Sequence, residues 1–202
     1  MTLWRGESRP VLASKSMSRQ SLLRGAGIPF DIDPADIDER ALQAAAGPVS
    51  PGRIAALLAA GKARVVSNRH PGRIVIGADQ TLALGARLFN KPADRAAAMT
   101  QLQALSGRTH ELHSAIAIAR DGQVLDETVA VARMTFRVLD ETAVARYLDL
   151  AGDVVLSSVG AYQLEGLGVH LFERIEGDYF TILGLPLVPL LASLRRLDLL
   201  AI

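Results

Sequence analysis

Cysteine is absent from this chain of 202 residues, and aromatic residues make up only 4% of it. The lack of cysteine excludes disulfides and thiolate metal sites, and it is compatible with a reducing compartment. No apolar run approaches the roughly eighteen residues of a membrane-spanning helix. The opening segment, MTLWRGESRP, also lacks the apolar stretch of a signal peptide. We therefore expect a cytoplasmic protein without a membrane partner.

An excess of either charge is also missing. The chain has 22 Lys and Arg against 21 Asp and Glu, with no block of like charge. A nucleic-acid groove needs clustered basic residues or an aromatic stacking surface, so we expect no nucleic-acid partner. Half of the residues are hydrophobic, which excludes a disordered chain. The length suits a single domain over residues 1–202, with residues 1–8 as a loosely ordered lead-in.

Apolar periodicity and turn residues predict strands that alternate with helices. Strands are expected at residues 10–14 and 73–79 and within 169–183, with a hairpin over 109–139 that turns at an Asp-Gly pair. Helices are expected over a segment that ends at Gly27 and over residues 52–69, 93–107, 140–152 and 185–200. This order predicts an α/β fold, with a mixed sheet flanked by helices.

The segment LASKSMSRQSLL, residues 12–23, places serines between a strand and the start of a helix. Free backbone N–H groups and hydroxyls at the positive end of a helix suit a phosphate. Ser14 and Ser16 are candidate donors, and Arg19 is a candidate charged fork. The alternative is that the serines only cap the helix and that Arg19 is solvated.

The segment VIGADQTLALGARLFNKPAD, residues 75–94, begins as a buried strand and then reaches an acid, Asp79. Open α/β sheets bind ligands beyond the carboxyl ends of their strands, where Asp79 is placed to hold a divalent cation or to activate water. Lys91, twelve residues later, is a candidate for neutralising a phosphate. The alternative is an Asp that forms a turn and pairs with a nearby Lys.

Other polar residues carry weaker signals. Glu39 and Lys62 lie at the edges of predicted helices, where a surface role is the ordinary explanation. Glu165 lies in a glycine-containing segment that is typical of a tight loop. His110 and His113 lie three apart in a predicted strand, and we expect that spacing to place them on opposite faces, so they are poor ligands for one metal.

Together these segments resemble the Maf family, once described as septum formation inhibitors and understood as nucleoside triphosphate pyrophosphatases. The matching segments, in the family's order, are LASKSMSRQSLL, DIDE, LLAAGKA, VIGADQ, NKPAD, LSGRTHEL, GAYQLEG and EGDYFTILGLPL. They run from about residue 11 to residue 190. The resemblance implies an α/β fold like that of inosine triphosphatases, with a deep central cleft. It also implies a divalent metal, Mg²⁺ or Mn²⁺, a nucleoside triphosphate substrate and a homodimer.

The resemblance also implies roles for particular residues. Asp79 matches the catalytic acid that accepts a proton from water, and Glu39 matches an acidic position that we assign, with Asp79, to the metal. Five residues match the phosphate-binding positions, namely Ser14, Ser16, Arg19, Lys62 and Lys91. Hydrolysis at the α-phosphorus would expel pyrophosphate, whose charge these cations complement.

Substrate choice in the family turns on three positions. Members that prefer dTTP and UTP carry Arg near Ser18, Thr next to the catalytic acid and Gln at the position of Glu165. Gln80 and Glu165 resemble instead the subfamily that hydrolyses 7-methyl-GTP, which usually has a bulky aromatic residue in place of Ser18. A carboxylate also suits a guanine edge, because it can accept both N1–H and N2–H. We expect a modified-purine preference.

Three other functions stay open from the sequence. A dTTP- and UTP-preferring enzyme of the same family, or an inosine-triphosphate-type pyrophosphatase, would run the same reaction on another base. A non-catalytic, nucleotide-binding regulator of cell division would need no base at Asp79. Replacement of Asp79 by Asn separates the regulator from the enzymes.

Overall fold

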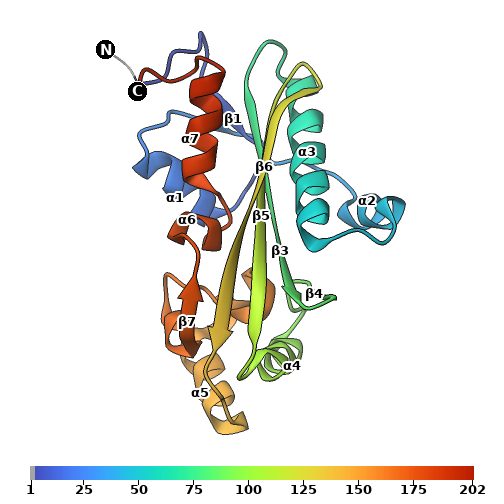
Figure 1. The fold of residues 1–202 in the computed structure, drawn as a ribbon, viewed down its shortest axis with the longest axis vertical. Coiled ribbons are helices and arrows are strands. Elements are labelled where there is room, and N and C mark those ends of the chain that lie inside the picture. Colours follow the sequence, from blue (N-terminus) through green and yellow to red (C-terminus); the bar gives the residue numbers. More distant parts are fainter. Residues whose placement is uncertain (1–2) are drawn as a thin grey trace. The chain divides into compact units, whose positions relative to one another are not determined.

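A computed structural model, which describes residues 3–202, has a mixed α/β fold (Figure 1). Its strands follow the order β2-β1-β3-β5-β6-β7, with β4 paired to β3. The pairs β1–β2 and β1–β3 are parallel, whereas β3–β4 and β6–β7 are antiparallel, so the predicted mixed sheet is confirmed. The strands are β1 (Val11–Leu12), β2 (Asp31–Ile32), β3 (Val75–Leu84), β4 (Arg87–Phe89), β5 (Thr109–Arg120), β6 (Gln123–Phe136) and β7 (Phe172–Glu176).

The predicted helices are also found. They are α1 (Met17–Gly25), α3 (Pro51–Arg69), α4 (Arg95–Leu105), α5 (Glu141–Ala151) and α7 (Leu187–Arg196). Two further helices, α2 (Glu39–Ala46) and α6 (Tyr179–Ile182), lie in segments for which the sequence predicted no helix. The Asp38 side chain caps α2 by accepting from the N–H of Ala41. Across residues 3–202, no helix is long and apolar enough to cross a membrane.

The chain divides into two compact units. The first contains the residues up to Gln80 together with Ser114–Ala130 and Gly184–Ile202, and the second contains Thr81–His113 and Val131–Leu183. Strands β3, β5 and β6 each contribute residues to both units. The expectation of a single domain over residues 1–202 stays a prediction.

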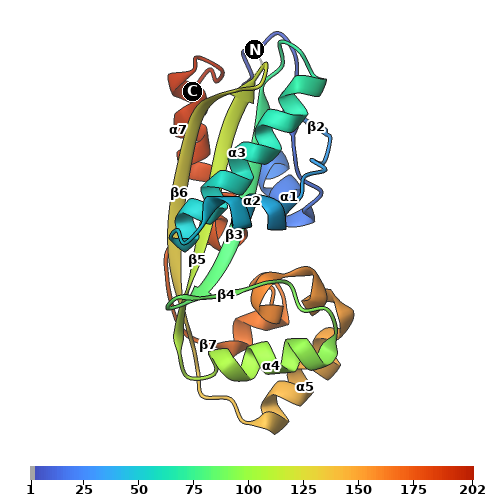
Figure 2. The ribbon, with the colours of Figure 1, turned by 90° about the vertical axis from the view of Figure 1, so that its right-hand side faces the viewer.

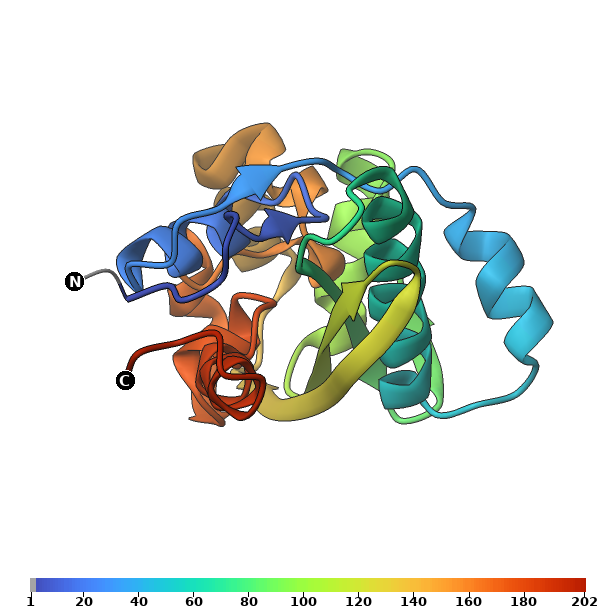
Figure 3. The same cartoon turned by 90° about the horizontal axis from the view of Figure 1, so that it is seen from above.

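In the first unit, α3 packs closely on the sheet. Alanines of α3, including Ala59 and Ala63, share a core with Ala115, Ala117 and Ala119 of β5. A Cβ atom added to Gly77 of β3 would lie only 2.2 Å from the Ala59 carbonyl oxygen, so only glycine permits this approach. Figures 2 and 3 show α3 along one face of these strands, with α1 and α7 on the opposite side. The small residues of α3 therefore bring its polar residues next to β3.

Strand β3 continues past Asp79, which corrects one expectation. The predicted strand ended at residue 79, but the observed strand runs to Leu84. Its parallel pairing with β1 nevertheless ends at Ile76, opposite Leu12. Asp79 therefore lies just beyond the parallel part of the sheet, where the serine segment after β1 also begins. Asp79 was expected beyond the carboxyl end of a strand. It does lie beyond the end of the parallel pairing of β1 with β3, but β3 itself continues.

Part of the lead-in is packed. Trp4 is buried, forms an isolated bridge with Leu200 and donates from Nε1 to the Ser8 carbonyl at 2.8 Å. A Cβ atom on Gly6 would lie 2.7 Å from the Trp4 ring. Trp4 therefore belongs to the core of the first unit. Residues 1–2 of the lead-in lie outside the described residues.

The hairpin between β5 and β6 has the predicted turn. Asp121 and Gly122 have φ angles of 52° and 77°. Positive φ at both central residues is the requirement of a type I′ turn, which Asp-Gly satisfies well. The register of the two long strands, and with it the inward direction of their alanines, is set by this turn.

Candidate active site

The serine segment forms the predicted turn at the start of α1. Ser16 is the N-cap, and its Oγ accepts from the Arg19 N–H at 3.5 Å. The buried Ser14 Oγ accepts from the Ser16 N–H at 3.3 Å and from Arg19 Nη1 at 3.2 Å. The serines therefore do cap the helix, as the alternative explanation held. Arg19, however, is not simply solvated, because its side chain donates hydrogen bonds within the protein.

Two backbone carbonyls hold the Arg19 guanidinium. Nε donates to the Gly184 carbonyl at 2.8 Å, and Nη1 donates to the Ala78 carbonyl at 2.7 Å. Burial lowers the pKa of Arg19, and the negative charges of Asp79 and Glu39 oppose that shift. An arginine stays protonated in such surroundings. These bonds use Nε and Nη1 and fix the guanidinium in place. Nη2 of Arg19 is therefore the candidate donor to an anion.

Lys62 joins two carboxylates. Its Nζ lies 2.6 Å from Asp79 Oδ1 and 2.7 Å from Glu39 Oε1. The Asp79 and Lys62 side chains are 9% and 13% exposed, whereas that of Glu39 is 49% exposed. The inner ion pair is thus shielded from solvent, and the outer one is open to it. Helices α2 and α3 and strand β3 each contribute one member.

Burial raises the pKa of Asp79, and the positive charges of Lys62 and Arg19 act against that shift. Glu39 adds a smaller effect in the raising direction, because it is a second negative charge. A buried carboxylate with a raised pKa is a better base than an exposed Asp. This environment is the kind that active sites use to tune an acid.

Gln80 faces different neighbours from Asp79, since successive strand residues point to opposite faces. Its Nε2 donates to the Oγ of the buried Ser114 at 2.9 Å. A Cβ atom added to Gly184 would lie 3.6 Å from Gln80 Oε1 and 3.4 Å from Arg19 Nε. Gly184 has a φ of 87°, which strains any other residue. The sequence reasoning missed both Gly184 and Ser114; a glycine just before the predicted last helix was the one available signal.

The first unit therefore brings together most of the predicted site residues. These are Ser14, Ser16, Arg19, Glu39, Lys62, Asp79 and Gln80. Ser18 also belongs to this unit and is half-buried in α1. Their assigned roles stay predictions.

Two predicted site residues belong to the second unit. Lys91 is exposed and follows β4, and Glu165 is exposed in the loop before β7. A Cβ atom on Gly168 would lie 2.4 Å from the Gln163 carbonyl oxygen, so this loop is as tight as expected. Their roles toward phosphate and base stay predictions.

Carboxylate oxygens are the ligands that Mg²⁺ prefers, and Asp79 and Glu39 present theirs around a shared cation, Lys62. Among residues 3–202, no group of three or more His, Cys, Asp or Glu side chains could hold a metal ion. Mg²⁺ is commonly held by one or two carboxylates together with substrate phosphates. The two carboxylates therefore fit a metal that binds with its substrate, but not a metal caged by protein alone.

The two histidines of β5 have different partners. His110 is fully buried, and its Nε2 lies 2.8 Å from the Tyr162 hydroxyl. His113 is partly buried and lies 3.1 Å from Glu111 of its own strand. That these histidines are poor co-ligands for one metal stays a prediction.

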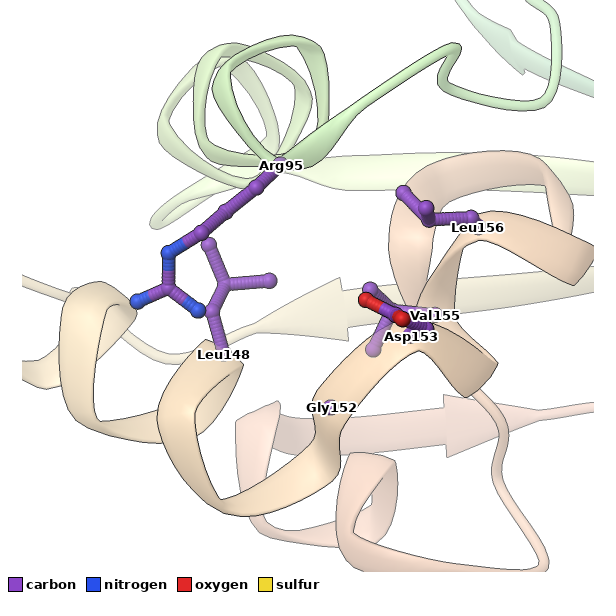
Figure 4. Close-up of a pocket in the computed structure, with 6 residues that line it drawn as sticks. All are labelled: Arg95, Leu148, Gly152, Asp153, Val155 and Leu156. Carbon is purple, nitrogen blue, oxygen red and sulfur yellow. The ribbon is translucent and has the colours of Figure 1, made fainter.

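A cavity in the second unit offers no rival site. It has a volume of about 40 Å³ and is lined by Arg95, Leu148, Gly152, Asp153, Val155 and Leu156 (Figure 4). Pockets that hold small organic ligands measure roughly 300–1,000 Å³. The polar residues around Asp79 are therefore the better candidate site.

A family model described as "Maf-like protein" matches residues 9–197. The chain belongs to this family. A relative from Rhodopseudomonas palustris (strain ATCC BAA-98 / CGA009), named nucleoside triphosphate pyrophosphatase, is 64% identical over the full length of both chains. A relative of that name from Bradyrhizobium diazoefficiens is 62% identical, also over both full lengths. The Maf resemblance predicted from the sequence is thus confirmed.

Two further similarities are more limited. A relative from Brucella abortus biovar 1, named 7-methyl-GTP pyrophosphatase, is 55% identical over 92% of this chain and 94% of its own. A solved HAM1 protein from Coxiella burnetii is 24% identical, with a TM-score of 0.43 over 63% of this Maf-like chain and 72% of its own.

Proposed function

We propose that this Maf-like chain hydrolyses a nucleoside triphosphate to a monophosphate and pyrophosphate, with a preference for a modified purine such as 7-methyl-GTP. The reaction class is supported by relatives that are 60–64% identical and are named nucleoside triphosphate pyrophosphatases. The observation that carries the proposal is the buried Asp79 carboxylate beside Lys62 and Arg19. A pure binder of nucleotides has no need of a base that is buried among cations.

In this proposal Asp79 takes a proton from the water that attacks the α-phosphorus. A bond forms between that water oxygen and the α-phosphorus, and the bond from the α-phosphorus to the bridging oxygen of pyrophosphate breaks. The Nη2 end of Arg19 and the backbone N–H groups after Ser14 are the donors in the first unit that bind phosphate oxygens. Lys62 holds the Asp79 carboxylate in place, and Lys91 adds a further cation for the leaving group.

A divalent cation fits the carboxylates of Asp79 and Glu39, with Lys62 as the neighbour that it would meet. When bound, such a cation would neutralise phosphate charge and make water a stronger acid. A triphosphate carries roughly four negative charges, so fixed cations alone are a poor complement. We propose Mg²⁺ or Mn²⁺ as the metal.

Two observations favour the modified purine. Gln80 stands next to Asp79, and its amide is oriented by Ser114. Glu165 offers only acceptor oxygens, which suit the N1–H and N2–H donors of guanine and repel the carbonyls of uracil. The Brucella relative named for 7-methyl-GTP agrees with this preference.

The test is product analysis with Mg²⁺ across 7-methyl-GTP, GTP, ITP, UTP, dTTP and CTP, scoring pyrophosphate against orthophosphate. We expect pyrophosphate, with 7-methyl-GTP or GTP giving the highest kcat/KM. Pyrophosphate with UTP and dTTP leading would keep the reaction and refute the role of Gln80 and Glu165. A lead for ITP would favour a housecleaning pyrophosphatase. No turnover by folded protein would favour a nucleotide-binding regulator.

A further inference from the structure

Helix α2 lies at the surface of the first unit. None of its side chains is buried, and Leu42 is 38% exposed. The helix lies outside α3, on the side away from the sheet (Figures 1 and 3). It also ends at Gly47, whose φ of 66° breaks the helix. Its position therefore depends on where it meets α3.

That meeting point is Gly61 in the middle of α3. A Cβ atom added there would lie 3.2 Å from Leu42 Cδ1 and 3.7 Å from Ile37 Cδ1. Glycine is a poor helix former, so α3 loses stability at this position relative to alanine. The missing side chain leaves a notch at Gly61 that is occupied by Leu42 of α2 and by Ile37, two residues before the helix begins.

The notch lies next to the polar residues of the site. Lys62 follows Gly61 directly and bridges Glu39 and Asp79 at 2.7 and 2.6 Å. Glu39 and Leu42 are three residues apart on α2, so they share one face of the helix. When Leu42 rests in the notch, the Glu39 carboxylate is therefore carried to the outer side of Lys62.

We propose that Gly61 is a positioning residue. It docks α2 through Leu42 and Ile37, and so places Glu39 against Lys62 beside Asp79. In this proposal Gly61 acts through α2 and not on the substrate. The inference rests on the proposed function in one respect, that Glu39 and Asp79 serve the same site.

The test uses Gly61→Ala in the full-length chain. Hydrogen exchange, read by mass spectrometry over residues 41–46, reports the docking of α2. We expect these amides to exchange at least fivefold faster and kcat/KM to fall roughly 10-fold, since small misplacements at a site are costly. The melting temperature should stay the same or rise, because alanine favours the α3 helix. A structural defect would lower it instead.

A second variant tests the contact itself. Leu42→Ala removes the Cδ1 atom that an alanine at position 61 would crowd. In the double variant, Gly61→Ala with Leu42→Ala, α2 loses three carbon atoms and α3 gains one. Because Leu42→Ala already removes the contact, we expect Gly61→Ala to cause little further loss of protection or activity in the double variant, so that the two changes are not additive.

Gly25→Ala is the matched control, because Gly25 is also helical and an added Cβ atom there meets nothing within 4 Å. It should leave exchange in α2 unchanged. The proposal is overturned if Gly61→Ala leaves exchange and kcat/KM within twofold of the parent, or if it loosens α3 together with α2. Exchange needs no turnover, so it decides the docking of α2 even if the substrate panel refutes the proposed function.

Discussion

The two units each bury a titratable side chain, and they deal with it in opposite ways. Asp79 in the first unit has Lys62 at 2.6 Å, and the charge of Arg19 also acts on it. His110 in the second unit is surrounded by Phe136, Tyr162 and Phe172, with ring centroids 5.2, 5.7 and 6.2 Å away. Burial lowers the pKa of His110 to about 4. Opposite charges act against the effect of burial on the pKa of Asp79, whereas burial alone acts on the pKa of His110.

The difference indicates where chemistry is placed. Burial raises the pKa of the Tyr162 hydroxyl that meets His110, so both partners are neutral near pH 7. The His110 Nδ1 atom is also buried and has no hydrogen-bond partner among residues 3–202. That aromatic core gains packing and a single polar contact. The residues around Asp79 instead hold several charges close together, an arrangement that is typical of active sites.

The largest effect should come from removing the base. We expect Asp79→Asn to lower kcat by roughly 10³-fold, since general-base catalysis contributes about 10²–10⁴-fold. The melting temperature should change little, because Asn keeps the shape and can still accept from Lys62. Turnover with the best substrate and thermal unfolding check both expectations. A variant that keeps more than a tenth of the parent's turnover would refute the role of Asp79 as base.

The second prediction concerns acid stability in the second unit. His110 has a pKa of about 4 when folded against 6.5 ordinarily, so the unfolded chain binds its proton first as the pH falls. Stability from the neutral ring is full above pH 6.5 and is lost progressively toward pH 4, by about 3 kcal/mol. Denaturant unfolding at pH 7 and pH 4.5 measures this loss.

A pair of variants assigns that loss to one residue. His110→Gln should be less stable at pH 7 but should depend less on pH than the parent. His113→Gln, on the same strand but only partly buried, is the comparison variant. Equal slopes in the parent and His110→Gln would place the acid sensitivity elsewhere.

The smallest effect should come from changing Ser114, the hydrogen-bond partner of Gln80. Ser114→Ala removes the hydroxyl that receives the Gln80 amide, a hydrogen bond worth about 1 kcal/mol. We expect discrimination between 7-methyl-GTP and UTP to fall roughly fivefold, with kcat on the better substrate nearly unchanged. Ser114→Thr keeps a hydroxyl and should restore the ratio. An unchanged ratio in the alanine variant would mean that Ser114 does not orient Gln80.

Local rules made much of the fold predictable from the sequence. The turn at Asp121 and Gly122, the helix with its N-cap at Asp140 and the alanine-rich helix α3 follow from side-chain periodicity and cap chemistry, which act over a few residues. Helix α2 was not predicted, because the acidic segment before it is typical of a turn. The helix is also short and has no buried face that would give an apolar periodicity. The end of β3 was predicted wrongly because a strand can continue past an acidic residue when distant residues pair with that acid. Here Lys62 of α3 pairs with Asp79.

The sequence by itself determined the order of strands and helices, the absence of thiol chemistry and, through its eight segments, the Maf family. Only the tertiary structure decided which residues meet. Arg19 is held by a carbonyl 165 positions away, and Lys62 meets Asp79 because alanines and Gly77 let α3 approach β3. Such contacts depend on the packing of distant segments, which no local pattern encodes. Charged residues that lie far apart along the chain become neighbours when those segments pack.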